Sequence, residues 1–157
     1  MMKILEGKLK AQRKRFAIIV SRFNNFVTKN LLDGCQKELW RLGIKENQII
    51  VIGVPGAYEI PLAALKAARR KDIAAVICLG AVIRGETIHF DLVAHNAARG
   101  IAQVALTTGK PVIFGVLATD TVDQAYKRAG KEEKNRGVQA ARDALEMADL
   151  MDRLSHA

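Results

Sequence analysis

AVICLGAVIRGETIHFD, residues 75–91, contains an apolar run followed at once by a dense group of polar and ionisable side chains. The first five residues are apolar and partly β-branched, which is typical of a strand buried on both faces of a parallel sheet. We expect this strand to end in a turn that contains Gly80 and Gly85, because glycine lets the backbone turn tightly and approach a ligand closely. A helical spacing of apolar residues begins near Phe90 and continues to Gly109. The stretch therefore predicts a strand, a turn that carries chemistry, and a helix.

The residues just before this helix have the features of a phosphate site. Gly85, Glu86 and Thr87 precede the predicted helix, and His89 and Asp91 lie at its start. A helix N-terminus collects unpaired N–H groups and the positive end of the helix dipole, both of which favour a bound phosphate. An ordinary loop with a surface histidine would have the same local pattern, so this stretch alone leaves both interpretations open.

Length and composition indicate a single domain. A chain of 157 residues can bury roughly two thirds of its unfolded surface without disulfides or metal ions, so we expect one domain over residues 1–157. Cys35 falls in a helical pattern and Cys78 in the buried strand, as is typical of reduced core cysteines in an intracellular protein. The sequence has no apolar stretch of the ~20 residues that a membrane span needs, and no apolar signal core follows Met1. We therefore expect a cytoplasmic protein that does not associate with membranes.

The formal net charge of +9 raises the question of an anionic partner. Basic residues are concentrated within residues 8–15 and again at Arg69, Arg70 and Lys71. No aromatic side chains interleave with either run and no nucleic-acid-binding motif is present, so we expect no specific nucleic-acid binding. A small phosphorylated substrate accounts for local positive charge equally well.

Apolar runs and helical spacings alternate along the whole chain. Residues 1–15 are weakly patterned and predict either a short edge strand or an arm that packs on a neighbour. A first helix is expected to start after Asn24 or Asn25, either of which is a suitable cap, and to end at Gly43. The expected strands cover residues 16–20, 48–54, 75–79 and 112–117. The later helices cover residues 60–70, 90–108, 121–129 and 136–154, with a charged loop at 130–135.

This alternation predicts an α/β fold: a three-layer α/β/α sandwich around a four-stranded parallel sheet. Parallel neighbours need crossover connections, and the helices supply them on both faces of the sheet. In such sheets ligands bind outside the carboxyl ends of the strands. The side chains of most chemical interest follow the expected strands, which favours a functional interpretation of all of them: Phe23 and Asn24, Tyr58 and Glu59, residues 85–89, and Thr119.

Several other kinds of site do not fit the sequence. Neither a dinucleotide-binding fingerprint nor a Walker-type phosphate loop is present. The three histidines are dispersed, so we expect no metal site. Nucleophilic catalysis by Ser21 or Cys78 would need an adjacent base that the sequence does not place there. The interpretation that remains is a site with a histidine, hydrogen-bond donors for a phosphate group and an aromatic ring for stacking.

Five motifs, taken together, resemble those of the lumazine synthase family, which catalyses the penultimate step of riboflavin biosynthesis. The resemblance runs in order from about Ile4 to Leu154 and implies a flavodoxin-like fold. The motifs are SRFN at 21–24, VPGAYEIP at 54–61, GAVIRGETIHFD at 80–91, FGV at 114–116, and residues 124–137 ending in NRG.

The resemblance implies a condensation reaction. The substrates would be 5-amino-6-(D-ribitylamino)uracil and 3,4-dihydroxy-2-butanone 4-phosphate, and the products 6,7-dimethyl-8-ribityllumazine, phosphate and water, with no cofactor. It also implies a homo-pentamer, either free or assembled into a sixty-subunit shell, with riboflavin synthase as a further candidate partner.

The resemblance further implies a role for each matching residue. His89 and Arg128 would be catalytic, His89 as a proton shuttle, because a histidine with a reference pKa of ~6.5 suits transfer in both directions. Ring contacts would come from Phe23, Asn24, Ala81, Val82 and Ile83, ribityl contacts from Ala57, Tyr58 and Glu59, and phosphate contacts from Glu86 and Thr87. The neighbouring subunit would supply Phe114, Arg128 and Arg136.

Three positions depart from the commonest family pattern. Arg136 stands where lysine is usual, Gln139 where glutamate is frequent, and Glu86 where alanine or glycine is frequent. Three other functions compete with lumazine synthesis: an archaeal-type riboflavin synthase, which dismutates lumazine, a non-catalytic lumazine- or flavin-binding module or cage scaffold, and a signalling domain of similar topology. Retention of Phe23, His89 and Arg128 argues against the non-catalytic module, and Phe23-Asn24 is not the acidic cluster that a signalling domain needs after its first strand.

Overall fold

Four parallel strands form one sheet in the computed structural model, which describes residues 1–11 and 13–157. The strands are β1 (Arg15–Ser21), β2 (Ile49–Val54), β3 (Ile73–Ile83) and β4 (Val112–Thr119). Their spatial order is β2-β1-β3-β4, so β1 and β3 are central and β2 and β4 are edges. Every neighbouring pair is parallel, which confirms the predicted sheet.

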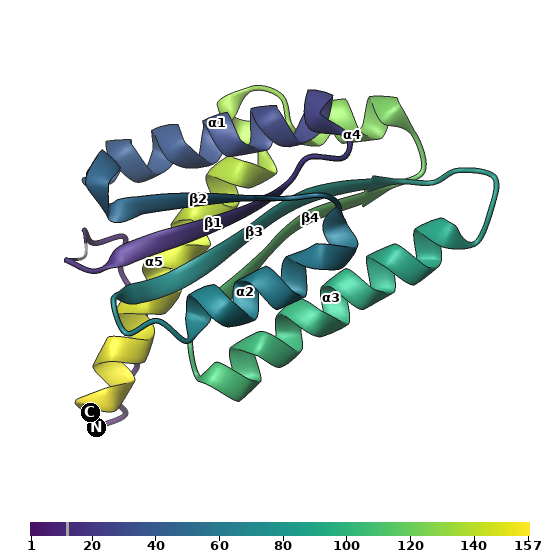
Figure 1. Cartoon of the computed structure of the whole chain (residues 1–157). Coiled ribbons are helices and arrows are strands. Elements are labelled where there is room, and N and C mark those ends of the chain that lie inside the picture. The colour runs from purple at the N-terminus through teal and green to yellow at the C-terminus, as the bar shows by residue number, and fades with distance from the viewer. Residues whose placement is uncertain (12) are drawn as a thin grey trace.

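The helices cover both faces of this sheet (Figure 1). Helices α1 and α5 pack together on one face with α4 beside them, and α2 and α3 pack together on the other. The three-layer, flavodoxin-like architecture predicted from the sequence is therefore confirmed. None of the described helices is long and apolar enough to cross a membrane. The helices are α1 (Asn25–Arg41), α2 (Ile60–Ala68), α3 (His89–Thr108), α4 (Val122–Arg128) and α5 (Arg136–Ser155), with 3₁₀ turns η1 (Glu46–Gln48), η2 (Ala57–Glu59) and η3 (Glu132–Lys134).

The central strands are buried on both faces because helices cover both. In β1, Phe16 and Ile18 pack toward α1 and α5, whereas Ala17 and Ile19 pack toward α2 and α3. This alternation follows from the two-residue period of a strand. It explains why central strands here are apolar runs instead of alternating apolar and polar residues.

β3 is longer at both ends than the sequence predicts, and Gly80 lies inside it instead of forming a turn. Gly80 pairs with Val116, and the ladder continues as far as Ile83. A Cβ on Gly80 would come within 3.0 Å of the Ser21 hydroxyl oxygen and 3.1 Å of the Ile60 Cδ1 atom. The glycine therefore permits close packing at the carboxyl end of the sheet, and the turn begins only after Ile83.

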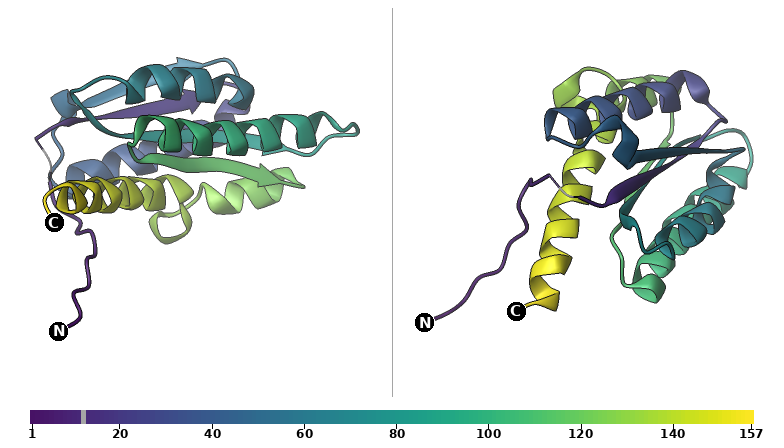
Figure 2. Two further views of the ribbon diagram at one scale, coloured as in Figure 1. Left: turned by 90° about the horizontal axis from the view of Figure 1, so that it is seen from below. Right: turned by 60° about the vertical axis from the view of Figure 1, so that its left-hand side comes forward.

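Residues 1–11 form no strand within this chain, so of the two alternatives expected for the N-terminal segment the short edge strand is not found there, and the arm that packs on a neighbour stays a prediction. The segment leaves the three layers near the end of α5, as Figure 2 shows. The backbone N–H of Lys8 donates to a carboxylate oxygen of Asp149 at 2.9 Å. The other elements begin and end within a few residues of their predicted positions, and the charged loop at 130–135 contains η3.

An ion cluster joins the two helices on one face of the sheet. Glu38 of α1 is only 6% exposed and accepts from Arg41 at 2.7 and 2.8 Å and from Arg142 of α5 at 2.7 Å. The hydrogen bonds from Arg41 and Arg142, with their positive charges, lower the pKa of Glu38 to about 2, although burial opposes the shift. The cluster therefore holds α5 against α1 while Glu38 is ionised.

Candidate active site

The segment after β1 is held against the segment after β2. The backbone N–H groups of Arg22 and Phe23 donate to the carbonyl oxygens of Val54 and Pro55 at 2.8 and 3.0 Å. The Phe23 side chain is left 70% exposed. A large aromatic side chain presented in this way by a fixed backbone is suited to stacking on a flat ring.

Asn24 is the residue before α1, but its side chain does not cap the helix. Its backbone is left-handed, with φ 60° and ψ 42°, a conformation that asparagine adopts more readily than most residues. Its amide nitrogen instead donates to the carbonyl oxygen of Ala81 at 2.9 Å. Asn24 therefore ties the end of β1 to the end of β3, and the predicted side-chain cap is absent.

The turn after β2 forms η2 directly beside α3. Ala57 is buried, whereas the side chains of Tyr58 and Glu59 are exposed. The Asn96 amide nitrogen of α3 lies 3.4 Å from the Tyr58 carbonyl oxygen and donates to it. This contact fixes the turn relative to the helix that begins with His89.

His89 is the first residue of α3, at the carboxyl end of β3. Its backbone N–H donates to the Thr87 hydroxyl oxygen at 3.2 Å, so the Thr87 side chain satisfies the first N–H group of the helix. Glu86, Thr87 and His89 are all exposed. The side chains that could exchange protons or bind phosphate therefore lie at a positive helix end that remains open to a ligand.

These segments enclose a cleft of about 230 Å³, which we call the strand-end cleft. It gathers most of the predicted ring-contact and phosphate-contact residues, while Tyr58, Glu59 and Glu86 lie outside its lining. Phe90 and Val93 also line it and were not predicted, although their spacing along α3 is the signal that could have identified them. The lining residues are Phe23, Asn24, Ala57, Ala81, Val82, Ile83, Gly85, Thr87, His89, Phe90 and Val93.

Arg84 holds the loop between β3 and α3 in place, a role that the sequence did not indicate. Its Nε atom donates to Asp120 at 2.9 Å, and its Nη1 atom lies 3.4 Å from Asp91. Its guanidinium carbon lies 4.3 Å from the centre of the Phe90 ring. The hydrogen bond to Asp120 is the largest cause of a raised Arg84 pKa, so the side chain stays charged. Arg84 thus connects the loop that carries Thr87 to the segment after β4.

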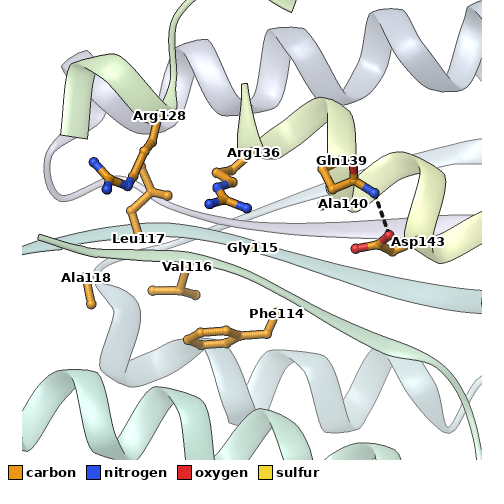
Figure 3. Close-up of a pocket in the computed structure, with 10 residues that line it drawn as sticks. All are labelled: Phe114, Gly115, Val116, Leu117, Ala118, Arg128, Arg136, Gln139, Ala140 and Asp143. Atoms are coloured by element: carbon orange, nitrogen blue, oxygen red, sulfur yellow. Dashed lines mark hydrogen bonds between the residues drawn. The ribbon is translucent and has the colours of Figure 1, made fainter. Parts of the chain in front are cut away.

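The three residues expected from a neighbouring subunit line a different cleft, which we call the edge cleft. It has a volume of about 280 Å³ and lies along the edge strand β4, between α4 and α5. Figure 3 shows Arg128 and Arg136 extending toward β4, with the Phe114 ring on the other side of the strand. The lining residues are Phe114, Gly115, Val116, Leu117, Ala118, Arg128, Arg136, Gln139, Ala140 and Asp143.

Two helix ends position the arginines of the edge cleft. The Thr121 hydroxyl accepts from the Gln124 N–H at 3.1 Å and so caps α4, which ends at Arg128. The Arg128 Nη1 atom donates to the Gln124 carbonyl oxygen at 3.0 Å. Arg136 is the first residue of α5 and follows the buried cap Asn135.

Both polar atoms of the Asn135 side-chain amide form hydrogen bonds. Its oxygen accepts from the N–H groups of Gly137 and Val138 at 2.8 and 3.3 Å. Its nitrogen donates to three carbonyl oxygens, including that of Asn30 in α1 at 3.1 Å. The asparagine therefore fixes the start of α5, and with it Arg136, relative to α1.

The two clefts have no lining residue in common, so one chain presents two separate parts of the predicted site. Neither Arg128 nor Arg136 forms a salt bridge with a carboxylate in the part of the chain that the structure describes. Both arginines therefore remain available to an anionic group. No group of three metal-ligating side chains occurs among residues 1–11 and 13–157.

The chain is similar to known proteins over nearly its whole length. A family model described as 6,7-dimethyl-8-ribityllumazine synthase matches residues 13–152. A curated protein named 6,7-dimethyl-8-ribityllumazine synthase, from Desulfotalea psychrophila, is 54% identical over 150 residues. The aligned region covers 96% of this chain and 97% of that relative.

Proposed function

The chain belongs to the 6,7-dimethyl-8-ribityllumazine synthase family of riboflavin biosynthesis, and from this premise we propose the reaction that it catalyses. It condenses 5-amino-6-(D-ribitylamino)uracil with 3,4-dihydroxy-2-butanone 4-phosphate to form 6,7-dimethyl-8-ribityllumazine, phosphate and water. The carbon skeleton is built by imine formation, phosphate elimination and ring closure. Each step needs proton transfer but no electron transfer, so the proposed chemistry needs no redox cofactor.

The observation that carries this proposal is the strand-end cleft. Phe23 lines it from the segment after β1, Ala81 and Val82 line it from β3, and His89 lines it from the start of α3. Such a cleft can hold a flat pyrimidine against the aromatic ring. Tyr58 and Glu59 are exposed on the adjoining turn, where they would contact a ribityl chain that extends out of the cleft.

His89 is proposed as the residue that moves protons between the reacting groups. It is exposed at the start of α3, two residues after Thr87, which is proposed to bind phosphate through its hydroxyl and the nearby N–H groups. A positioned histidine typically accelerates proton transfer by ~10²–10⁴-fold. Holding two substrates in the same cleft supplies a further part of the acceleration through proximity.

The edge cleft is proposed to complete the site of a neighbouring copy. Arg128 would bind the substrate phosphate, Arg136 would lie near a ring carbonyl, and Phe114 would cover the pocket. This arrangement explains why these three residues do not line the strand-end cleft of their own chain. A head-to-tail contact that brings one edge cleft to each strand-end cleft closes into a ring.

Exposed apolar side chains on α2, on α3 and just before α3 support an assembly of this kind. Leu62 of α2 is 67% exposed, and Leu106 of α3 is 87% exposed. Ile88 and Leu92, near the start of α3, are also exposed. The spacing of Ile88, Leu92 and Leu106 places them on one side of α3, and an exposed apolar helix face is characteristic of a protein contact. We propose that the contact forms homo-pentamers in the cytoplasm, either free or closed into sixty-subunit shells, with riboflavin synthase as a candidate partner.

The three departures from the family pattern lie in different surroundings. Gln139 donates to Asp143 at 2.8 Å, so its side chain is already engaged along α5. Glu86 is exposed and outside the strand-end cleft, so its carboxylate can point away from a bound phosphate. Arg136 keeps a positive charge but presents a forked donor, which we expect to change substrate affinity and leave the reaction unchanged.

The proposed function is tested by supplying purified protein with both substrates and measuring lumazine and phosphate release. Lumazine formation that requires both substrates is the expected result. The competing function, riboflavin synthesis by dismutation, predicts riboflavin when lumazine is supplied alone. That result, without condensation of the two substrates, would overturn the proposal in favour of the related enzyme.

A further inference from the structure

The basic runs before the strands take no part in the two clefts described above. Residues 13–15 lead into β1, residues 69–71 precede β3, and Lys110 stands two residues before β4. Because all four strands are parallel, their amino ends share one end of the sheet, opposite the strand-end cleft (Figure 1). The fold therefore gathers basic segments that are far apart in the sequence.

A third cleft, of about 680 Å³, opens at this end of the sheet, and we call it the amino-end cleft. It lies between residues 10, 11, 13 and 14, the turn before β4 and the last turns of α5. Its volume falls within the ~300–1,000 Å³ that is usual for small-molecule sites. The charged lining residues are Lys10, Arg13, Lys14, Lys110, Asp149 and Asp152.

Of the two carboxylates of the amino-end cleft, Asp149 is hydrogen-bonded by groups outside the cleft and Asp152 is exposed. Asp149 accepts from Arg153 at 2.6 Å and from the Lys8 backbone at 2.9 Å, and the hydrogen bond from Arg153 is the largest cause of its lowered pKa. An oxygen of Asp152 lies 3.8 Å from the His156 ring nitrogen Nδ1. Within residues 1–11 and 13–157, no salt bridge joins either carboxylate to a cation that lines this cleft, although the charge of Lys10 contributes to the lowered pKa of Asp149.

Lys110 is the most constrained of these cations. Its ammonium group is partly buried and donates to the carbonyl oxygen of Arg70. Burial and the positive charge of Lys14 lower its pKa, and Asp72 offsets this only in part. Asp72 is itself bound by Arg70 at 2.8 Å. A partly buried charge without an opposite partner is unfavourable, and a bound anion would relieve it.

We propose that the amino-end cleft binds a polyvalent phosphate anion, such as the triphosphate group of a nucleotide. Lysine ammonium groups and the arginine fork together match a compact group of several phosphate oxygens. The lining holds no aromatic side chain on which bases of a nucleic-acid strand could stack, which favours a small anion. This site is separate from the proposed active site and does not depend on the proposed reaction.

The test is a calorimetric titration with inorganic tripolyphosphate at roughly physiological ionic strength, where long-range attraction is screened. The assembled protein carries Arg128→Ala, so that the arginine proposed to bind substrate phosphate does not contribute. In this background, Lys14→Gln with Lys110→Gln should weaken binding about tenfold or more, since charged hydrogen bonds to phosphate are the strong ones. A matched pair, Lys29→Gln with Lys66→Gln, removes two exposed lysines away from the cleft and should change the affinity by less than about twofold.

Two comparisons keep the test decisive. Lys14→Gln alone alters an exposed side chain, so it remains informative if loss of the Lys110 contact to Arg70 disturbs folding. Adenosine triphosphate should bind about as tightly as tripolyphosphate, and adenosine monophosphate more weakly. Equal weakening by the cleft pair and the matched pair would overturn the proposal, because it would mean diffuse charge attraction. Absence of binding, or equal affinity for the monophosphate, would overturn it too.

Discussion

Glu38→Gln should lower the free energy of unfolding by an amount that depends on pH. The substitution keeps the shape of the side chain but removes the charge that Arg41 and Arg142 share. The pKa of Glu38 falls from an ordinary value of 4.5 to about 2 in the folded chain. At 1.36 kcal/mol per pKa unit, this difference in pKa limits the loss in the free energy of unfolding to about 3 kcal/mol.

Solvent reduces that limit. The Arg41 and Arg142 side chains are 60% and 43% exposed, so water screens part of their interaction with the buried carboxylate. We therefore expect a loss of about 1–2 kcal/mol at neutral pH. Because the folded pKa is depressed, the stabilisation is complete above pH 4.5 and disappears as the pH falls through about 2.

Urea denaturation at fixed protein concentration, from neutral pH down to about pH 3, measures the effect. The matched control is Asp33→Asn on the same helix, which removes a carboxylate that is 60% exposed and lies 2.9 Å from Lys37. The control substitution should lower the free energy of unfolding by less than about 0.5 kcal/mol. Equal losses in the two variants, or a Glu38→Gln loss that stays constant with pH, would show that the cluster does not join α1 to α5 as described.

Three further predictions concern the proposed active site. His89→Ala should lower turnover by ~10²–10⁴-fold while pyrimidine binding stays largely intact; a loss of activity explained by substrate affinity alone would contradict the proton-transfer role. Arg128→Ala should raise the KM of the phosphate substrate strongly, and an unchanged KM in steady-state kinetics would remove the phosphate assignment. Phe23→Ala should weaken pyrimidine binding by ~1–3 kcal/mol, measured by calorimetry, if stacking here resembles base stacking on aromatics; full affinity in the variant would contradict the stacking role.

The layer arrangement could be predicted from the sequence because the pattern of central strands is unambiguous. Phe16 to Ile19 form a continuous apolar run, and such runs alternate with helical spacings along the chain. The rule that ligands bind at the carboxyl ends of parallel strands then placed Phe23 and His89 near each other. The structure brings both residues to the strand-end cleft.

The predictions for Gly80 and Asn24 were wrong because glycine and asparagine each occur for more than one structural reason. Gly80 resembled a turn glycine, but close contact with Ser21 and Ile60 is what requires it, and only the packed sheet reveals that contact. Asn24 resembled a helix cap, yet its amide finds a partner 57 residues away, at Ala81. Contacts of long range in the sequence leave no local pattern, and the Arg84 contacts to Asp120 were missed for the same reason.

The proposed division of the site between two clefts comes from the family resemblance and not from periodicity or charge. Arg128 and Arg136 have no local sequence feature that separates them from surface arginines. The structure places both along β4, in a cleft that has no lining residue in common with the one that holds His89. The proposal that the site is shared between neighbouring chains can be tested directly.

The most direct test of that claim mixes two inactive chains, one with His89→Ala and one with Arg128→Ala. Refolded separately and assayed with the phosphate substrate well below the raised KM of the Arg128→Ala chain, each chain should be nearly inactive, since every site lacks one of the two groups. Refolded together in equal amounts, they should recover about a quarter of wild-type activity, because random mixing around a ring gives that fraction of sites with both groups intact. Native mass spectrometry confirms that both chains enter the same assembly. Mixed assemblies without recovered activity would contradict the account, because they would place His89 and Arg128 of one chain in the same site.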